Sequence, residues 1–117
     1  MKNTFEEMVN GLSKEGDAII NSLTGEKAHL LHMAIGIAGE AGELLDAIKK
    51  HVIYEKELDV ANVVEELGDL EFYMEGLRQV TLITRELTLE QNMKKLAKRY
   101  KGHIYTDQQA QDRADKA

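Results

Sequence analysis

Two pairs of acidic residues with the same spacing constrain the fold of this chain more than any other feature. Glu40 and Glu43 form the first pair, and Glu66 and Asp69 form the second. The pairs mirror each other about a point between residues 54 and 55. If two antiparallel helices meet in a turn at that point, each acid lies level with an acid of the other helix, because both helices rise equally per residue. The pattern therefore predicts a helical hairpin on which four carboxylates converge.

The acids border apolar stripes on both expected helices. At about 100° of rotation per residue, Glu40 lies at the edge of one apolar arc and Glu66 at the edge of a similar arc. A carboxylate beside a core-facing stripe is in position to be partly buried. The arcs consist of Met33, Ile37, Ala41, Leu44 and Ile48 on the first helix, and of Val63, Leu67, Leu70, Met74 and Leu77 on the second.

Four converging carboxylates favour a metal centre, because like charges repel and raise each other's pKa unless cations lie between them. Oxygen ligands suit hard divalent ions, so Mg²⁺ is expected, with Mn²⁺ as a substitute. A single acidic pair on a helix is more often a solvated surface, but two mirrored pairs beside apolar stripes favour the metal. Glu65 is turned farther from the stripe and is expected on the surface or behind the ligands.

A ferritin-like di-iron bundle would also project carboxylates from its helices. That bundle needs a glutamate three residues before a histidine on each of two helices. The sequence has this spacing once, at Glu26 and His29, so the di-iron hypothesis is disfavoured. His32 lies two turns before Glu40 and could contact a substrate, although a surface or capping role is the alternative for a lone histidine.

Composition limits the classes of protein to which the chain could belong. A length of 117 residues fits one domain, and 43% hydrophobic residues are ordinary for a folded one. The net charge of −6 argues against a general nucleic-acid binder, which needs a basic surface. No apolar run approaches the length that spans a bilayer, no signal-peptide core follows the first residues, and cysteine is absent. We therefore expect a cytoplasmic protein with no membrane partner.

The sequence predicts an all-α fold, because no segment alternates as a strand does and proline is absent. Capping boxes are expected at Thr4 with Glu7, at Thr88 with Gln91 and at Thr106 with Gln109, and Asp59 is a further expected N-cap. A break is expected at residues 22–25. The predicted helices cover about residues 4–22, 26–51, 60–85 and 88–102, followed by a loosely held tail.

Cationic side chains offer further candidate contacts for a phosphate. Asn92, Lys95 and Arg99 share one face of the fourth expected helix. Lys50 lies on the Glu43 edge of the second, where a lysine near a helix C-terminus also interacts favourably with the macrodipole. The polar and cationic ridge of Asn92, Lys95 and Arg99 is suited to phosphate or sugar recognition, and a merely solvated surface is the alternative.

At these residues the chain resembles a known family. The stretch with E-x-x-E, a spacer and E-x-x-D, and the later N-x-x-K-L-x-x-R-Y run at residues 92–100, resemble the MazG-like branch of the all-α nucleoside triphosphate pyrophosphohydrolases. Lys101 stands where a proline commonly follows R-Y, and Glu71 and Glu75 make the third expected helix more acidic than is usual. The resemblance covers roughly residues 26–113.

We expect a single four-helix MazG-like domain over residues 1–105, with residues 106–117 as the loosely held tail. The resemblance further implies an enzymatic activity. It implies Mg²⁺-dependent cleavage of a nucleoside or deoxynucleoside triphosphate to the monophosphate and pyrophosphate, in the service of nucleotide-pool sanitation. Helical hairpins would assemble into a homo-oligomeric bundle, a dimer or a dimer of dimers, with the pocket lined by more than one subunit. A non-catalytic helical interaction module is the alternative, but it gives no reason for four mirrored acids.

Overall fold

The computed structural model describes residues 4–116, and within them it contains helices and no strand. The expected all-α fold is therefore confirmed. Residues 1–3 and 117, which the sequence assigned to the ends of the domain and the tail, lie outside the described residues. In chain order the elements are α1 (Phe5–Leu12), α2 (Gly16–Ser22), α3 (Gly25–Val52), α4 (Val60–Thr81), α5 (Arg85–Arg99), the short 3₁₀ helix η1 (Lys101–His103), α6 (Asp107–Asp112) and η2 (Ala114–Lys116).

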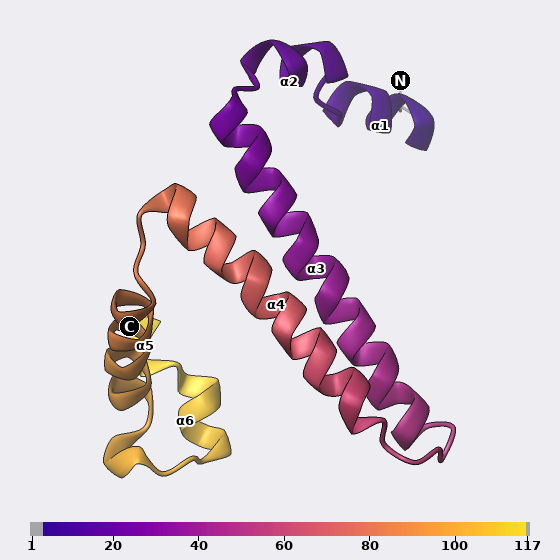
Figure 1. The fold of residues 1–117 in the computed structure, drawn as a ribbon. Helices are drawn as coiled ribbons and strands as arrows, with labels where there is room; N and C mark the ends of the chain where they lie inside the picture. Colours follow the sequence, from indigo (N-terminus) through magenta and orange to yellow (C-terminus); the bar gives the residue numbers. More distant parts are fainter. Residues whose placement is uncertain (1–3, 117) are drawn as a thin grey trace.

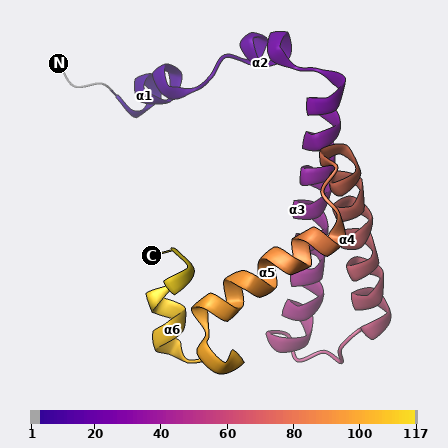
Figure 2. The same ribbon diagram turned by 90° about the vertical axis from the view of Figure 1, so that its left-hand side faces the viewer.

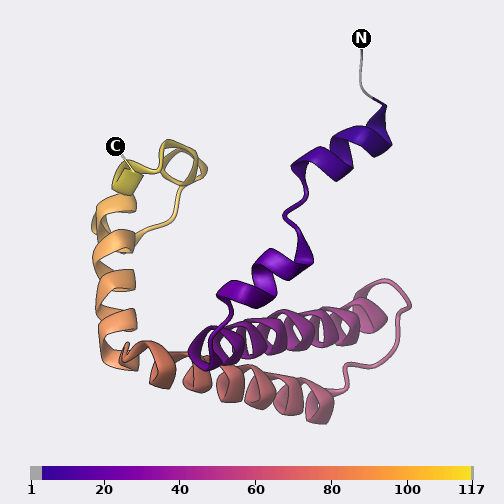
Figure 3. The same ribbon diagram turned by 90° about the horizontal axis from the view of Figure 1, so that it is seen from above.

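The two longest helices, α3 and α4, form the expected antiparallel hairpin and lie side by side (Figure 1; Figure 3). Residues 53–59 connect them, and the backbone of Glu55 adopts a left-handed conformation with φ 54°. Asp59 caps α4, because its side chain accepts a hydrogen bond of 3.1 Å from the Asn62 N–H. The turn therefore lies where the mirrored acids required it.

Glycines allow α3 and α4 to approach closely in the half of the hairpin that lies away from the turn. A Cβ atom at Gly36 would overlap the Tyr73 ring, and a Cβ atom at Gly76 would overlap the sulfur of Met33. Each glycine therefore leaves room for a large side chain of the opposite helix. Met33 is buried at this contact, and Ala47 is buried nearer the turn. These contacts fix how the acidic residues of the two helices face each other.

The N-terminal segment differs from the sequence prediction, because the single helix expected over residues 4–22 is two helices, α1 and α2. Thr4 caps α1 as expected by accepting from the Glu7 N–H at 3.2 Å. The break falls at Ser13, whose backbone is extended and whose hydroxyl donates to the Val9 carbonyl at 2.6 Å. A serine hydroxyl that bonds to the carbonyl four residues earlier slightly destabilises a helix. The expected break at residues 22–25 is confirmed, with Thr24 as the cap of α3.

The junction between α4 and α5 also differs from the prediction. Helix α4 ends at Thr81, not near residue 85, because Leu82 is left-handed with φ 60° and the Ile83 N–H bonds back to the Arg78 carbonyl. Helix α5 begins after Thr84, which accepts from the Leu87 N–H at 3.0 Å. Thr88, the expected cap, lies inside the helix and donates its hydroxyl to the Thr84 carbonyl. The earlier cap adds one further turn of backbone hydrogen bonds.

The C-terminal segment folds back along α5. Helix α5 ends at Arg99, and Gly102 turns the chain with φ 69°. Thr106 caps α6 as expected, by accepting from the Gln109 N–H at 3.1 Å. The guanidinium of Arg99 then binds the carboxylate of Asp115. The division of the chain at residue 105 stays a prediction, while the described part of the tail packs against α5.

Two arms leave the open end of the hairpin, opposite the turn between α3 and α4, and extend away from it. Helices α1 and α2 leave at the start of α3, and α5 with α6 leaves at the end of α4 (Figures 1 and 2). The radius of gyration is 20.2 Å, against about 13 Å for a compact domain of this length. Among residues 4–116 no helix is both long and apolar enough to cross a membrane.

Candidate metal centre on the helical hairpin

Three of the four predicted acids meet across the hairpin. Glu40 of α3 and Glu66 and Asp69 of α4 each offer a carboxylate oxygen, and these oxygens lie within 4.8 Å of one another. Glu43 is exposed and lies outside this trio. Its charge still acts on Glu66, so it lies at the periphery of the cluster. We refer to Glu40, Glu66 and Asp69 as the acidic trio; the assignment of all four acids as ligands stays a prediction.

Glu66 is the most unusual member of the acidic trio. It is 9% exposed, and its Oε2 atom is buried without a hydrogen-bond partner among the described residues. Hydrogen bonding with the Glu40 carboxyl, then burial, then the negative charges of Glu40, Asp69 and Glu43, raise the pKa of Glu66 to about 7. A buried carboxylate normally has a partner, so this oxygen requires either a proton or a cation.

The acidic trio suits a hard divalent cation. All its donors are carboxylate oxygens, which are the ligands that Mg²⁺ and Mn²⁺ accept. Two helices hold these oxygens together before any ion binds, and the orphaned Glu66 oxygen supplies an acceptor with no other use. A small octahedral ion usually keeps several waters and takes further oxygens from a phosphate. The residues present therefore fit such an ion.

Lys50 and His32, the two candidate substrate contacts on α3, have neighbours of their own. The Lys50 ammonium lies 3.1 Å from the Asp46 carboxylate one turn earlier. Hydrogen bonding and attraction to Asp46, with smaller contributions from Glu43 and Asp59, raise the pKa of Lys50. The His32 ring lies edge-on to the Tyr73 ring, with 6.2 Å between the ring centres. Their roles in substrate binding stay predictions.

Helix α5, which carries Asn92, Lys95 and Arg99, diverges from the hairpin (Figures 1 and 2). Helix α5 therefore does not pack beside the acidic trio of its own chain. Arg99 is occupied by Asp115, with Nε–Oδ1 and Nη2–Oδ2 distances of 2.6 and 3.2 Å. Sequence reasoning missed Asp115, because no local pattern relates it to a residue sixteen positions earlier.

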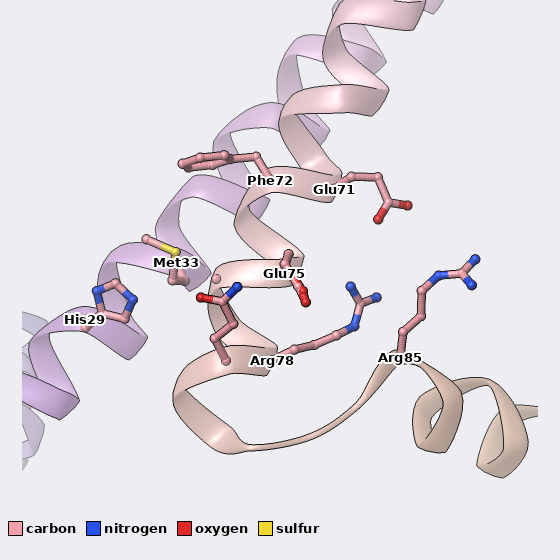
Figure 4. A pocket seen from close by; sticks show the side chains of 9 residues that line it. His29, Met33, Glu71, Phe72, Glu75, Arg78 and Arg85 are labelled. Atoms are coloured by element: carbon pink, nitrogen blue, oxygen red, sulfur yellow. The ribbon is translucent and has the colours of Figure 1, made fainter.

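A cavity of about 680 Å³ lies beside the hairpin, and its lining does not include the acidic trio. In Figure 4 the His29 and Met33 side chains lie on the α3 side, and the Glu75, Arg78 and Arg85 side chains lie on the other side of α4. The lining of this cavity thus combines the apolar Met33 and Phe72 side chains with side chains of both charges. Sequence reasoning missed it, since Arg85 comes from the junction whose caps were predicted wrongly.

Comparison with known proteins now identifies the class of protein. Residues 28–104 match the family described as MazG nucleotide pyrophosphohydrolase domain. The match covers more than half of the 117 residues and includes both acidic pairs and the whole of α5. The chain therefore belongs to this family, as the sequence resemblance indicated. No curated protein and no solved structure matches the chain.

Proposed function

We propose that this protein is a Mg²⁺-dependent nucleoside triphosphate pyrophosphohydrolase. It would hydrolyse a nucleoside or deoxynucleoside triphosphate to the monophosphate and pyrophosphate, and so remove unwanted nucleotides from the pool. Membership of the MazG family supports this activity. The observation that carries the proposal is the buried, unpartnered Glu66 oxygen within 4.8 Å of the other acidic-trio ligand atoms. A helical module without chemistry has no use for such a group.

In this proposal Glu40, Glu66 and Asp69 hold the metal, with Glu43 at the edge of the cluster. A bound Mg²⁺, or Mn²⁺ in its place, would supply a Lewis acid that lowers the pKa of water and offsets charge on the phosphate oxygens. Water attacks the α-phosphorus, and the bond between the α-phosphorus and the oxygen that bridges it to the β-phosphorus breaks. Pyrophosphate is thereby released. The general base is a carboxylate of the cluster or Glu65, which is exposed on α4 beside Glu66.

The cationic ridge of Asn92, Lys95 and Arg99 would bind the nucleotide. Lys95 holds the outgoing phosphates as a point charge, and Asn92 orients the nucleotide through its amide. Lys50 and His32 lie on α3 with the acids and would add contacts at the edge of the site. Because α5 diverges from the hairpin of its own chain, the ridge and the acids that act on one substrate would come from different subunits (Figure 2).

Exposed surface supports assembly into a homo-oligomer. The chain exposes 9744 Å², whereas a compact monomer of its mass exposes about 6,400 Å². The difference is of the size that obligate interfaces bury. Large apolar side chains contribute to it on the hairpin and on the N-terminal arm. They include Phe5, Leu12, Ile20, Ile35, Leu45, Val64 and Leu67. A dimer or a dimer of dimers would bury them and complete the site.

The same exposed surface favours the second candidate function, a helical interaction module. That hypothesis explains the apolar faces but leaves the buried Glu66 unexplained. We place the protein in the cytoplasm, without a nucleic-acid or membrane partner. The charge of −6 and the absence of cysteine support this placement.

A panel of common and modified triphosphates, incubated with and without Mg²⁺, tests the proposed activity. Chromatography of the products should show monophosphate and pyrophosphate only when Mg²⁺ is present. Diphosphate with orthophosphate as the first products would contradict attack at the α-phosphorus. If no triphosphate is cleaved while the protein assembles normally, the interaction module is the better account.

A further inference from the structure

The C-terminal segment places a carboxylate on the cationic face of α5. Asp115 and Arg99 form a two-pronged ion pair at 2.6 and 3.2 Å, with side-chain exposures of 6% and 15%. This buried pair is unlike the two other ion pairs of the described residues, whose side chains are more than half exposed. The fork of an arginine guanidinium matches a carboxylate and a phosphate in the same way. Asp115 therefore occupies a position in which a phosphate would fit.

The surroundings of Asp115 carry more positive charge than one carboxylate neutralises. A cavity of about 290 Å³ lies beside it, lined by Gln91, Lys94, Lys95, Lys98 and Lys116. Hydrogen bonding to Arg99 is the main cause that lowers the pKa of Asp115, and the charge of Lys95 contributes as well. A diphosphate group carries more negative charge than Asp115 and more acceptor oxygens. It would therefore interact with the lysines as well as with Arg99.

The segment that carries Asp115 is attached to α5 by few other bonds. The Lys101 N–H donates to the Gln109 side chain at 2.7 Å, and the Gln109 amide itself donates to Ile104 and Thr106. Arg113 reverses the chain in a left-handed conformation with φ 49° and ψ 56°, which a residue with a Cβ atom adopts at an energetic cost. Release of the segment would relieve that cost, and Asp115 would regain water as its partner.

We propose that Asp115 is a built-in competitor for a phosphate site formed by Arg99 and Lys95, and that a diphosphate or triphosphate group displaces it and releases residues 113–116 from α5. The inference rests on the proposed role of the α5 ridge in phosphate binding. It adds a gate to that ridge, because the site is open to the polyphosphate only when the segment leaves. The gate explains why a candidate phosphate contact is found bound to an aspartate of its own chain.

Binding of inorganic pyrophosphate to the full chain, measured by isothermal titration in metal-free buffer, tests the gate. Asp115→Asn should bind pyrophosphate at least about fivefold more tightly than the wild type, because the competing charge is gone. Asp112→Asn is the matched control, since it removes the same charge from the same segment, where Asp112 bonds only to Gln108 in an exposed position. It should stay within about twofold of the wild type. Equal affinities of the Asp115→Asn and Asp112→Asn proteins would overturn the proposal.

Hydrogen exchange of the wild-type chain provides a second test that needs no variant. Saturating pyrophosphate, or a non-hydrolysable triphosphate in a separate arm, should speed exchange of the Lys116 amide, which bonds to the Arg113 carbonyl at 2.8 Å. Unchanged or slower exchange in both arms would overturn displacement. These measurements are independent of turnover: a chain that binds pyrophosphate in this manner but cleaves no triphosphate would refute the proposed function and leave the gate intact.

Discussion

The buried Glu66 carboxyl predicts how the stability of the metal-free protein changes with pH. Its pKa is about 7 in the folded chain, against an ordinary value of 4.5. Between these values the folded chain therefore binds more protons than the unfolded chain. In this pH range the free energy of unfolding therefore falls as pH rises. The contribution of Glu66 is fully present below pH 4.5 and is lost as pH rises through about 7.

The size of this effect can be stated as a number of protons. At pH 6 the folded chain should hold about 0.9 proton more than the unfolded chain at this one carboxyl. Melting temperatures of the metal-free protein, measured across pH 4.5–7.5, should therefore decrease toward neutral pH. Glu66→Gln removes the titrating group and should flatten this dependence. Glu65→Gln removes the same charge from the exposed neighbouring position and should keep the wild-type dependence.

Added metal should reverse the trend, because a cation and a proton compete for the same oxygen. With Mg²⁺ or Mn²⁺ present, the melting temperature of the wild type should rise with pH through about 7. If the Glu66→Gln and wild-type proteins show the same pH dependence without metal, the carboxyl does not carry a raised pKa. The argument from burial and charge repulsion would then be refuted.

Three further predictions concern the rest of the site and the hairpin. Glu43→Ala should lower turnover at least about tenfold, as the loss of a group around a metal does, while the helical circular-dichroism signal stays unchanged. Unchanged turnover would show that Glu43 is not part of the metal centre. Lys95→Ala should weaken binding of a non-hydrolysable triphosphate but keep the affinity for Mn²⁺, because the lysine charge contacts the substrate and not the metal. Separate titrations of the two ligands measure this. An unchanged nucleotide affinity would mean that Lys95 is only a solvated surface residue. Gly36→Ala should lower the free energy of unfolding by about 1–3 kcal/mol because its Cβ would overlap the Tyr73 ring. Gly39→Ala, with nothing within 4 Å, should raise it by up to about 1 kcal/mol through helix propensity; denaturant unfolding of both variants checks the pair, and equal effects would contradict the close approach.

The hairpin could be predicted from the sequence because two independent patterns agree on it. The mirrored acids and the apolar arcs place the same residues on facing helices, and the Asp59 cap marks where α4 begins. Three of the four acids meet as the spacing required. The burial of Glu66 beside an exposed Glu43 was not predictable, since it depends on the side-chain packing of two helices.

The ends of helices were harder to predict where the deciding residue has no typical sequence signal. Leu82 ends α4 in a left-handed conformation that glycine more commonly adopts. At Ser13 the backbone becomes extended and ends a helix that the apolar pattern would continue. The Arg99–Asp115 pair depends on how the chain returns after Gly102, and no local periodicity encodes that path.

Binding of Mn²⁺, followed by the loss of its free-ion signal in electron paramagnetic resonance, tests the central claim most directly. The acidic trio is proposed to be the metal centre, so the wild type should bind Mn²⁺, and Mg²⁺ should compete for it. Asp69→Ala should lose this binding, whereas Glu71→Ala, which removes an exposed acid from the same helix, should keep it. Equal Mn²⁺ binding by the Asp69→Ala and Glu71→Ala proteins would contradict a metal centre at Glu40, Glu66 and Asp69.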